Sequence, residues 1–408
     1  MARRSICALL VAALTSGCGV SANQATETAA ARAPRPQPAN FDAWREEFRP
    51  VAYGAGVSPA TFDRAFAGVR PNETVMRLDG AQAEFTKPIW EYLDGAASSD
   101  RVAQGRGKAA GLAPTMQAIE ARYGVDGEVV LAIWGMESNY GGNRGSMPVI
   151  ESLATLAYEG RRRDFAEEQL LDALLILQAG DVAPQGLVGS WAGAMGHTQF
   201  MPGSYVAYAV DFTGDGRRDI WSDDPRDALA STANYLAQKG WVRGQPWGVE
   251  VRLPAGFNYA AADQSNRRPA ADWRARGVTR MDGRPLPDGT AAILAPAGAG
   301  GPAFAVYDNF FVIKTYNNAT AYALGVGHLG DRIAGGGPIE AAWPRHEREL
   351  SRSEKMEMQR RLTAMGYDTQ GTDGVIGPDT ISAIRAYQQS RGATPDGFAT
   401  AALLSGMR

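Results

Sequence analysis

Residues 125–142 read VDGEVVLAIWGMESNYGG, and this stretch decides how the rest of the chain is interpreted. On a helix, the carboxylate of Glu137 shares its face with the residues three, four and seven positions earlier, which are all apolar: Trp134, Ile133 and Val130. Gly141 and Gly142 are expected to end the helix. The pattern therefore predicts a single carboxylate on an apolar stripe, close to an open mouth.

Such a carboxylate is poorly hydrated when it is charged. We expect the pKa of Glu137 to rise from about 4.3 to roughly 6–7, which suits a general acid near neutral pH. Trp134 and Met136 are the adjacent candidates for the apolar wall that raises this pKa. The alternative is an ordinary glutamate at a helix end that points to solvent, which is the commoner case for a lone glutamate.

Two later segments favour the catalytic interpretation. Residues 189–205 read GSWAGAMGHTQFMPGSY, and residues 314–322 read KTYNNATAY. With residues 125–142, and in this order, they resemble the B-type family of lytic murein transglycosylases. The resemblance covers most of residues 41–333 and implies a mainly α-helical, lysozyme-like catalytic core.

The resemblance also implies the reaction and its residues. Standard glycosidases use two carboxylates, whereas lytic transglycosylases need one, because the C6 hydroxyl of the muramic acid attacks and leaves 1,6-anhydro-MurNAc ends. Glu137 would act first as acid and then as base, and neither later segment contains a second acid. Aromatic side chains suit sugar subsites because pyranose faces pack on them; ordinary packing is the alternative for Tyr92 and Tyr235. The implied substrate-binding residues are Tyr92, Ser190, Gln199, Tyr235, Tyr316, Asn317 and Tyr322.

Residues 211–222, DFTGDGRRDIWS, are similar to the calcium loop of an EF-hand. Oxygen donors occur at loop positions 1, 3, 5 and 9, a glycine occurs at position 6, and position 7 would offer its carbonyl. Ser222 stands at position 12, where a bidentate glutamate is usual, and Asp227 is its family-like replacement. The predicted ligands of a structural Ca²⁺ or similar hard cation are Asp211, Thr213, Asp215, Arg217, Asp219 and Asp227. An acidic turn without metal is the alternative.

The composition indicates a soluble globular protein of two or three domains, with 408 residues, 45% apolar and 21% charged. The formal net charge of −3, without a basic block, argues against nucleic acid as a partner. Cys7 and Cys18 are the only cysteines, so the domains have no disulfide framework and no cytosolic redox chemistry. The histidines lack metal-ligand spacing, which argues against zinc hydrolysis; they are His197, His328 and His346.

Residues 1–17 resemble a bacterial lipoprotein signal peptide, with two arginines before a short apolar run. Cys18 would become the lipidated first residue, and residues 18–40 are expected to be a disordered tether. Thr15 stands where leucine is usual, so secretion without a lipid is the alternative. We expect a periplasmic protein that is anchored to the outer membrane through Cys18.

Residues 41–333 are expected to form the catalytic domain, with a small β-containing insertion at 241–310 where strand-like alternation begins and Phe304 to Lys314 returning to the core. A linker at 334–348 comes next. Residues 349–408 resemble the three-helix peptidoglycan-binding domain, through the turn TDGVIGPDT. The expected partner is the peptidoglycan glycan strand, bound by a monomer.

Three hypotheses therefore stand: a lytic transglycosylase, a hydrolytic muramidase with the same acid, and a non-catalytic wall-binding protein. The first would leave 1,6-anhydro ends and the second new reducing ends. Residues 325–330, GVGHLG, spell a dinucleotide-binding fingerprint, but they come after a helical stretch and not a strand, so nucleotide binding is discarded.

Overall fold

The structure, a computed structural model, describes residues 38–80 and 87–407. The predicted signal peptide, Cys7, Cys18 and most of the predicted tether lie outside the described residues. The described chain is mainly helical, as expected. Its helices are α1 (Phe41–Gly54), α2 (Pro59–Phe66), α3 (Glu73–Gly80), α4 (Ile89–Ala96), α5 (Ser99–Gly111), α6 (Ala113–Tyr123), α7 (Gly127–Ser138), α8 (Val149–Glu159), α9 (Arg163–Ala179), α10 (Pro202–Tyr208), α11 (Arg226–Gln238), α12 (Ala270–Ala275), α13 (Asp308–Tyr316), α14 (Thr320–Ile333), α15 (Arg352–Ala364), α16 (Pro378–Ser390) and α17 (Ala401–Gly406).

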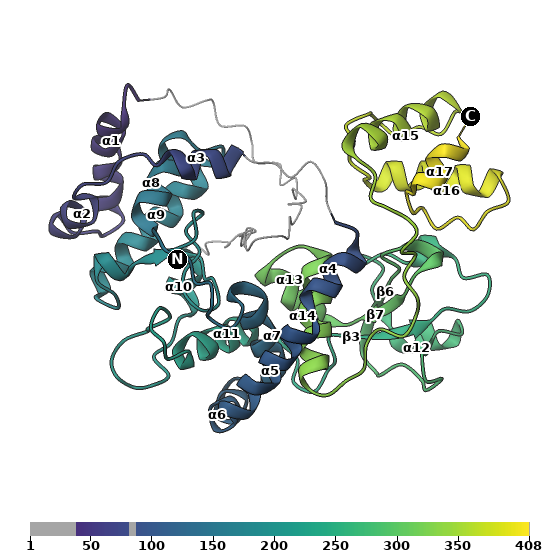
Figure 1. The fold of residues 1–408 in the computed structure, drawn as a ribbon, viewed down its shortest axis with the longest axis horizontal. Coiled ribbons are helices and arrows are strands. Elements are labelled where there is room, and N and C mark those ends of the chain that lie inside the picture. Colours follow the sequence, from purple (N-terminus) through teal and green to yellow (C-terminus); the bar gives the residue numbers. More distant parts are fainter. Residues whose placement is uncertain (1–37, 81–86, 408) are drawn as a thin grey trace.

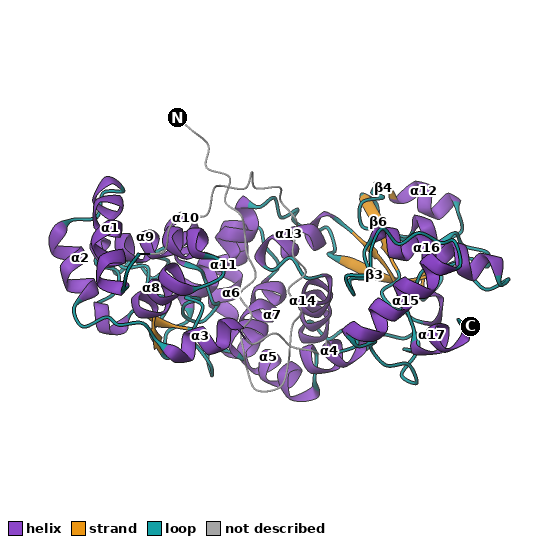
Figure 2. Cartoon of the chain, turned by 90° about the horizontal axis from the view of Figure 1, so that it is seen from above, coloured by secondary structure: helices purple, strands orange, loops and turns teal. Residues whose placement is uncertain are grey.

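Helices α1, α2, α3, α8, α9 and α10 form one end of the molecule (Figures 1 and 2). Ser58 caps α2 by accepting a hydrogen bond from the backbone N–H of Thr61, and Pro59 occupies the first turn, where proline is favoured. The core of this end is aromatic: Trp44 stacks on Phe48 with ring centroids 5.4 Å apart. Aromatic burial on this scale stabilises the lobe without disulfides.

Helix α7 lies in the middle of the molecule and packs against α5, α6, α11 and α14 (Figure 1). Nearly all of its residues are buried, including Glu137 at its C-terminal end. A helix that is apolar on every side needs neighbours on every side. The four surrounding helices therefore hold the C-terminal end of α7, with Glu137, in a defined place.

The predicted β-containing insertion is a five-stranded antiparallel sheet in the order β4-β6-β7-β3-β5. Trp273, fully buried on α12, lies at the centre of a small core that the sheet has to itself. Phe304 pairs with Glu250 and Leu294 inside the sheet, and its side chain packs in the main core with Phe310 of α13, as expected. The strands are β3 (Gly248–Arg252), β4 (Arg268–Pro269), β5 (Thr279–Arg280), β6 (Thr290–Leu294) and β7 (Ala303–Val306), and a separate two-stranded sheet pairs β1 (Met147–Pro148) with β2 (Val188–Gly189).

Helices α15, α16 and α17 form the expected C-terminal three-helix unit around a core of their own (Figure 1). The side chain of Gln359 stabilises the turn at residues 372–380 of this unit. It donates to Asp373 Oδ1 at 2.9 Å and accepts from the N–H of Gly374 at 2.8 Å.

None of the helices within residues 38–80 and 87–407 combines the length and the apolar character needed to cross a membrane.

Candidate active site

Helix α7 ends at Ser138, because Asn139 and Tyr140 both adopt the left-handed conformation, with φ of 50° and 55°. The expectation that Gly141 and Gly142 end this helix is therefore wrong by two residues. The reason is tertiary packing: the ring of Tyr140 lies where a Cβ on either Gly105 or Gly135 would clash, and its hydroxyl donates to the carbonyl of Arg101 at 2.9 Å. This long-range anchor stabilises a backbone that non-glycine residues rarely adopt.

Glu137 is 6% exposed, so its carboxyl group is removed from bulk water. Burial raises its pKa from 4.5 to about 8, although a hydrogen bond from Tyr322 lowers it. The Tyr322 hydroxyl donates to Glu137 Oε1 at 2.6 Å. Glu137 is therefore neutral at neutral pH and can donate a proton, as the sequence predicted.

Two tyrosines of the predicted set, Tyr316 and Tyr322, lie at this carboxyl group, and a third, Tyr92, lies near Tyr322. Burial, and next the charge of Glu137, raises the pKa of both Tyr316 and Tyr322 well above the usual value for tyrosine. Tyr92, on α4, also raises the pKa of Tyr322. The ring of Tyr92 lies beside Gly325, which is on the same helix as Tyr322, α14. The structure therefore brings Tyr316 and Tyr322 to Glu137, with Tyr92 next to Tyr322.

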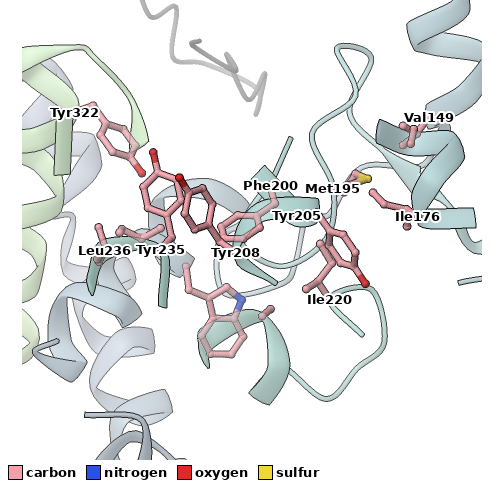
Figure 3. Packing of buried hydrophobic residues seen from close by; sticks show 14 of the residues in the cluster. Val149, Ile176, Met195, Phe200, Tyr205, Tyr208, Ile220, Tyr235, Leu236 and Tyr322 are labelled. Carbon is pink, nitrogen blue, oxygen red and sulfur yellow. The ribbon is translucent and has the colours of Figure 1, made fainter. Parts of the chain in front are cut away.

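Tyr235 belongs to the adjoining aromatic layer, with its ring 5.1 Å from Tyr316 and its hydroxyl on the carbonyl of Thr315. Figure 3 shows Tyr322 pointing from α14 toward Tyr235 on α11, with Tyr208 and Phe200 beyond. The ring of Tyr208 is 4.8 Å from that of Tyr235. Tyr208 was not identified as a site residue from the sequence. The available signal was its position three residues after Tyr205, on the short helix α10 that begins within residues 189–205.

The polar residues of the predicted set bond mainly to backbone. Ser190 Oγ accepts from the N–H of Ala194, and Asn317 Oδ1 accepts from the N–H of Ala319. Gln199 Nε2 donates to the carbonyls of Arg144 and Gly196. Within residues 38–80 and 87–407, neither Ser190 nor Gln199 hydrogen-bonds to Glu137. These bonds hold the loop beside the site in shape, and the substrate contacts of the three residues stay predictions.

Trp134 and Met136, the two residues predicted to form the apolar wall around Glu137, lie on different sides of α7. Met136 lies beside Gly325 of α14, on the same side as Tyr92. Trp134 packs edge-on against Tyr140 and His197, and it borders a cavity of about 400 Å³. Its contacts therefore lie on the side of α7 that faces His197.

The sequence matches the family model described as Transglycosylase SLT domain over residues 40–331. The chain belongs to this transglycosylase family. Residues 351–407 match a second family, described as a peptidoglycan binding domain. The lysozyme-like helical core and the three-helix C-terminal unit are thus features of a transglycosylase with a wall-binding module.

Solved structures resemble this transglycosylase over most of its length. The crystal structure of SltB3 from Pseudomonas aeruginosa in complex with NAG-anhNAM-pentapeptide is 53% identical, with a TM-score of 0.86, and covers 91% of this chain and 100% of that chain. Escherichia coli Slt35 in complex with calcium is 29% identical, with a TM-score of 0.62, and covers 73% of this chain and 96% of that one.

One curated relative also matches. Membrane-bound lytic murein transglycosylase B of Escherichia coli (strain K12) is 35% identical over 225 residues, or 52% of this chain. The chain spans 58% of the length of that relative.

The acidic loop of the transglycosylase brings three carboxylates together: ligand atoms of Asp211, Asp215 and Asp227 lie within 4.8 Å of one another. Backbone N–H groups of the loop, Gly216 first, hold the pKa of Asp211 below its usual value, so this carboxylate stays charged. Asp219 is not part of this cluster, and its Oδ1 accepts from the N–H groups of Trp221 and Ser222. A hard cation suits three convergent carboxylates; the roles of Thr213, Arg217 and Asp219 as ligands stay predictions.

Proposed function

We propose that this transglycosylase cleaves the β-1,4 bond between MurNAc and GlcNAc in peptidoglycan and leaves 1,6-anhydro-MurNAc ends. One observation carries the proposal: a glutamate buried at the end of α7, with a pKa of about 8, is protonated at neutral pH and receives a hydrogen bond from Tyr322. A neutral carboxyl group in a dry site is what a general acid needs.

The proposed reaction uses this group twice. Glu137 first gives its proton to the bridging oxygen, and the bond from that oxygen to the anomeric carbon of MurNAc breaks. The C6 hydroxyl of the same MurNAc then attacks the anomeric carbon, and its proton passes to the Glu137 carboxylate. In between, the Tyr322 hydroxyl stabilises the carboxylate, since a hydrogen bond to a charged oxygen favours the charged form.

Two observations support one acid in place of two. Burial and the Tyr322 hydrogen bond account for the shifted pKa of Glu137, and no other carboxylate of the described chain contributes to it. The related SltB3 was crystallised with NAG-anhNAM-pentapeptide, whose anhydro sugar is the kind of end that the proposed reaction leaves.

Product analysis tests the proposal. The protein is incubated with purified sacculi, and the released muropeptides are identified by mass spectrometry. We expect 1,6-anhydro-MurNAc ends. New reducing ends would instead identify a hydrolytic muramidase, and no release at all would identify a non-catalytic wall-binding protein.

We infer that the aromatic layer binds the sugar rings and that residues 351–407 hold the enzyme on the polymer. Tyr92, Tyr235, Tyr316 and Tyr322 offer apolar faces with polar tips next to Glu137, which is the chemistry of a sugar subsite. A tethered wall-binding module raises the local concentration of glycan strands.

We infer that the acidic loop holds a structural Ca²⁺ on Asp211, Asp215 and Asp227. The three carboxylates fit a hard cation, and Gly216, at the sharp turn, has φ of 88°. A related protein, Slt35, was crystallised with calcium. The cation would offset the repulsion among these carboxylates and stabilise the loop, with no part in the chemistry.

We propose a periplasmic location, with Cys18 lipidated and inserted in the outer membrane. The Escherichia coli relative is a membrane-bound murein transglycosylase by name. Mass spectrometry of the mature N-terminus tests this directly, because a lipidated Cys18 adds a diacylglycerol mass and an unmodified N-terminus contradicts the anchor.

A further inference from the structure

His197 lies between helix α7, which carries Glu137, and the acidic loop. Its side chain is 3% exposed, and it sits between the C-terminal end of α7 and the final turn of the acidic loop. Its position in the sequence has no metal-ligand spacing and indicates no role by itself. Three polar groups lie beside this imidazole: Trp134 Nε1, the carbonyl of Ser222 and Arg144 Nη1.

These contacts determine which ring nitrogen of His197 carries the hydrogen. Trp134 Nε1 can only donate, and it lies 3.1 Å from His197 Nδ1, so Nδ1 is the acceptor. The carbonyl of Ser222 can only accept, and it lies 2.7 Å from Nε2, so Nε2 carries the hydrogen. Arg144 Nη1 lies 3.3 Å from Nε2, but it makes its shorter bond, of 2.7 Å, to the same Ser222 carbonyl and does not need Nε2 as an acceptor. The ring is therefore the neutral Nε2–H tautomer, in agreement with burial, which lowers its pKa.

The backbone of His197 also hydrogen-bonds to both the acidic loop and α7. Its N–H donates to the carbonyl of Ile220 at 3.0 Å, and its carbonyl accepts from Ser138 Oγ at 2.5 Å. Ser138 directly succeeds Glu137, and Trp134 precedes it by one turn. The two α7 residues that contact His197 thus flank the catalytic carboxyl group along the helix.

The loop side of the contact is itself held in place. Asp219 Oδ1 accepts from the N–H of Ser222, and the N–H of Asp219 donates to Asp227 Oδ2. Arg144 Nη1 donates to the same Ser222 carbonyl at 2.7 Å. On the other side of the ring, Gly141 leaves room, since a Cβ there would lie 2.6 Å from Nδ1.

We propose that His197 is a positioning residue: its imidazole ties the end of α7 that carries Glu137 to residues 219–222 of the acidic loop. The inference rests on the proposed transglycosylase function and deepens it. Loss of the tie leaves Glu137 buried and acidic but lets it move relative to the sugar, and small displacements are costly in catalysis.

Kinetics on glycan strands test the tie with three replacements. His197→Phe keeps a ring of similar shape but removes both contacts. His197→Gln places an amide N–H near the position of Nε2, and His197→Asn places an amide oxygen near the position of Nδ1. The matched control is His346→Gln, because the His346 side chain is 81% exposed.

We expect His197→Phe to lower kcat by roughly 10- to 100-fold with KM changed less than twofold, while circular dichroism shows a folded protein at the assay temperature. His197→Gln and His197→Asn should each recover part of kcat, and His346→Gln should match the wild type. An equally active His197→Phe, or no recovery in either amide variant, overturns the inference.

A spectroscopic measurement on the unaltered protein removes any dependence on how the variants fold. Long-range ¹H–¹⁵N spectra at pH 7 should show His197 as the neutral Nε2–H tautomer, and the indole N–H signal of Trp134 should shift in His197→Phe more than in His197→Asn. A charged ring or the Nδ1–H tautomer overturns the inference. A wild-type protein that cleaves no glycan overturns the proposed function and the inference with it, whereas an active wild type with an unaffected His197→Phe overturns the inference alone.

Discussion

At the level of single residues, the site is a compromise between two opposing effects on Glu137. Burial favours the neutral acid, and the Tyr322 hydrogen bond favours the carboxylate that forms after proton transfer. Burial is the larger effect, so the resting group is protonated. In the proposed reaction, in which this group acts twice, the hydrogen bond would stabilise the carboxylate intermediate.

Glu137→Gln should lower kcat by about 10²-fold or more, because general acids contribute about that much, without weakening binding to sacculi. The pKa of Glu137 is higher in the folded state, about 8, than its usual 4.5, so its contribution to stability falls as pH rises from 4.5 to 8. The wild type should therefore lose roughly 3–5 kcal/mol of stability over this window that Glu137→Gln retains, because one pKa unit corresponds to about 1.4 kcal/mol. Thermal unfolding at pH 5 and pH 8 measures this; the same pH dependence in both proteins would contradict the assigned pKa.

Tyr322→Phe should raise the pKa of Glu137 further, because the lost hydrogen bond lowers it. The alkaline limb of the kcat profile, expected near pH 8, should move to higher pH, and kcat at pH 7 should fall roughly tenfold as the carboxylate intermediate loses a donor. The control is Tyr307→Phe, which loses one hydroxyl bond, to the carbonyl of Pro287, inside the sheet insertion. An alkaline limb that stays in place would show that Tyr322 does not act on this titration.

At the level of elements, the glycines of α14 serve close packing. Residues 325–330 spell a nucleotide fingerprint, but here they lie within one helix, and their missing side chains make room for neighbours. A Cβ on Gly327 would lie 2.2 Å from the ring of Trp247, and one on Gly325 would lie 3.1 Å from the Cβ of Ala96. Since α14 carries Tyr322, this contact helps to set the distance to Glu137.

Gly327→Ala should lower the free energy of unfolding by about 1–3 kcal/mol, because the added methyl group overpacks the Trp247 contact. Gly107→Ala on α5 is the matched control: nothing lies within 4 Å of a Cβ there, and alanine should stabilise the helix by about 0.5–1 kcal/mol. Urea denaturation midpoints with equal slopes give both values. A neutral Gly327→Ala would mean that Trp247 moves aside freely.

Removal of calcium should destabilise the protein, by about 2.7 kcal/mol relative to a calcium concentration 100 times the Kd. Asp227→Asn should abolish this calcium-dependent shift, because Asp227 is the buried member of the carboxylate cluster. Asp272→Asn, an exposed aspartate on α12, should keep the shift. Thermal unfolding with calcium and with a chelator provides the measurement; identical curves in the wild type would contradict the calcium site.

At the level of the whole molecule, residues 334–348 are packed on the rest of the chain. Glu250 accepts hydrogen bonds from the N–H groups of Glu340 and Ala341, and Arg345 makes two bonds to Asp94. The C-terminal unit continues this contact: Arg385 donates to the carbonyl of Tyr259 on the sheet insertion. The segment expected to be a linker therefore runs along the catalytic domain toward the wall-binding module (Figure 1).

A variant truncated after residue 348 keeps residues 334–348, which pack on the catalytic domain, and lacks only the wall-binding module. Its kcat on short soluble glycans should stay within about twofold, whereas the apparent KM on sacculi should rise roughly 10- to 100-fold because the tether is lost. Parallel assays on both substrates test this, with circular dichroism as the control for folding. Equal losses on both substrates would mean that the module supports the fold and not the binding of the polymer.

Several features are determined by the sequence alone. The 3.6-residue period around Glu137 predicted its burial, and the ordered motifs indicated the family. Caps, periodicity and motif order depend on neighbours within a few residues, so they can be read locally. The apolar stripe also predicted the direction in which the pKa of Glu137 shifts, toward its value of about 8.

Other features were decided only by tertiary structure. Tyr322 lies 185 residues from its partner Glu137, the end of α7 is set by the packing of Tyr140, and Asp219 turns away from the carboxylate cluster to its own loop. Each depends on which distant groups meet and at what distance. The physical reason is that hydrogen bonds and van der Waals contacts act over a few ångströms, and the sequence does not contain those distances until the helices pack.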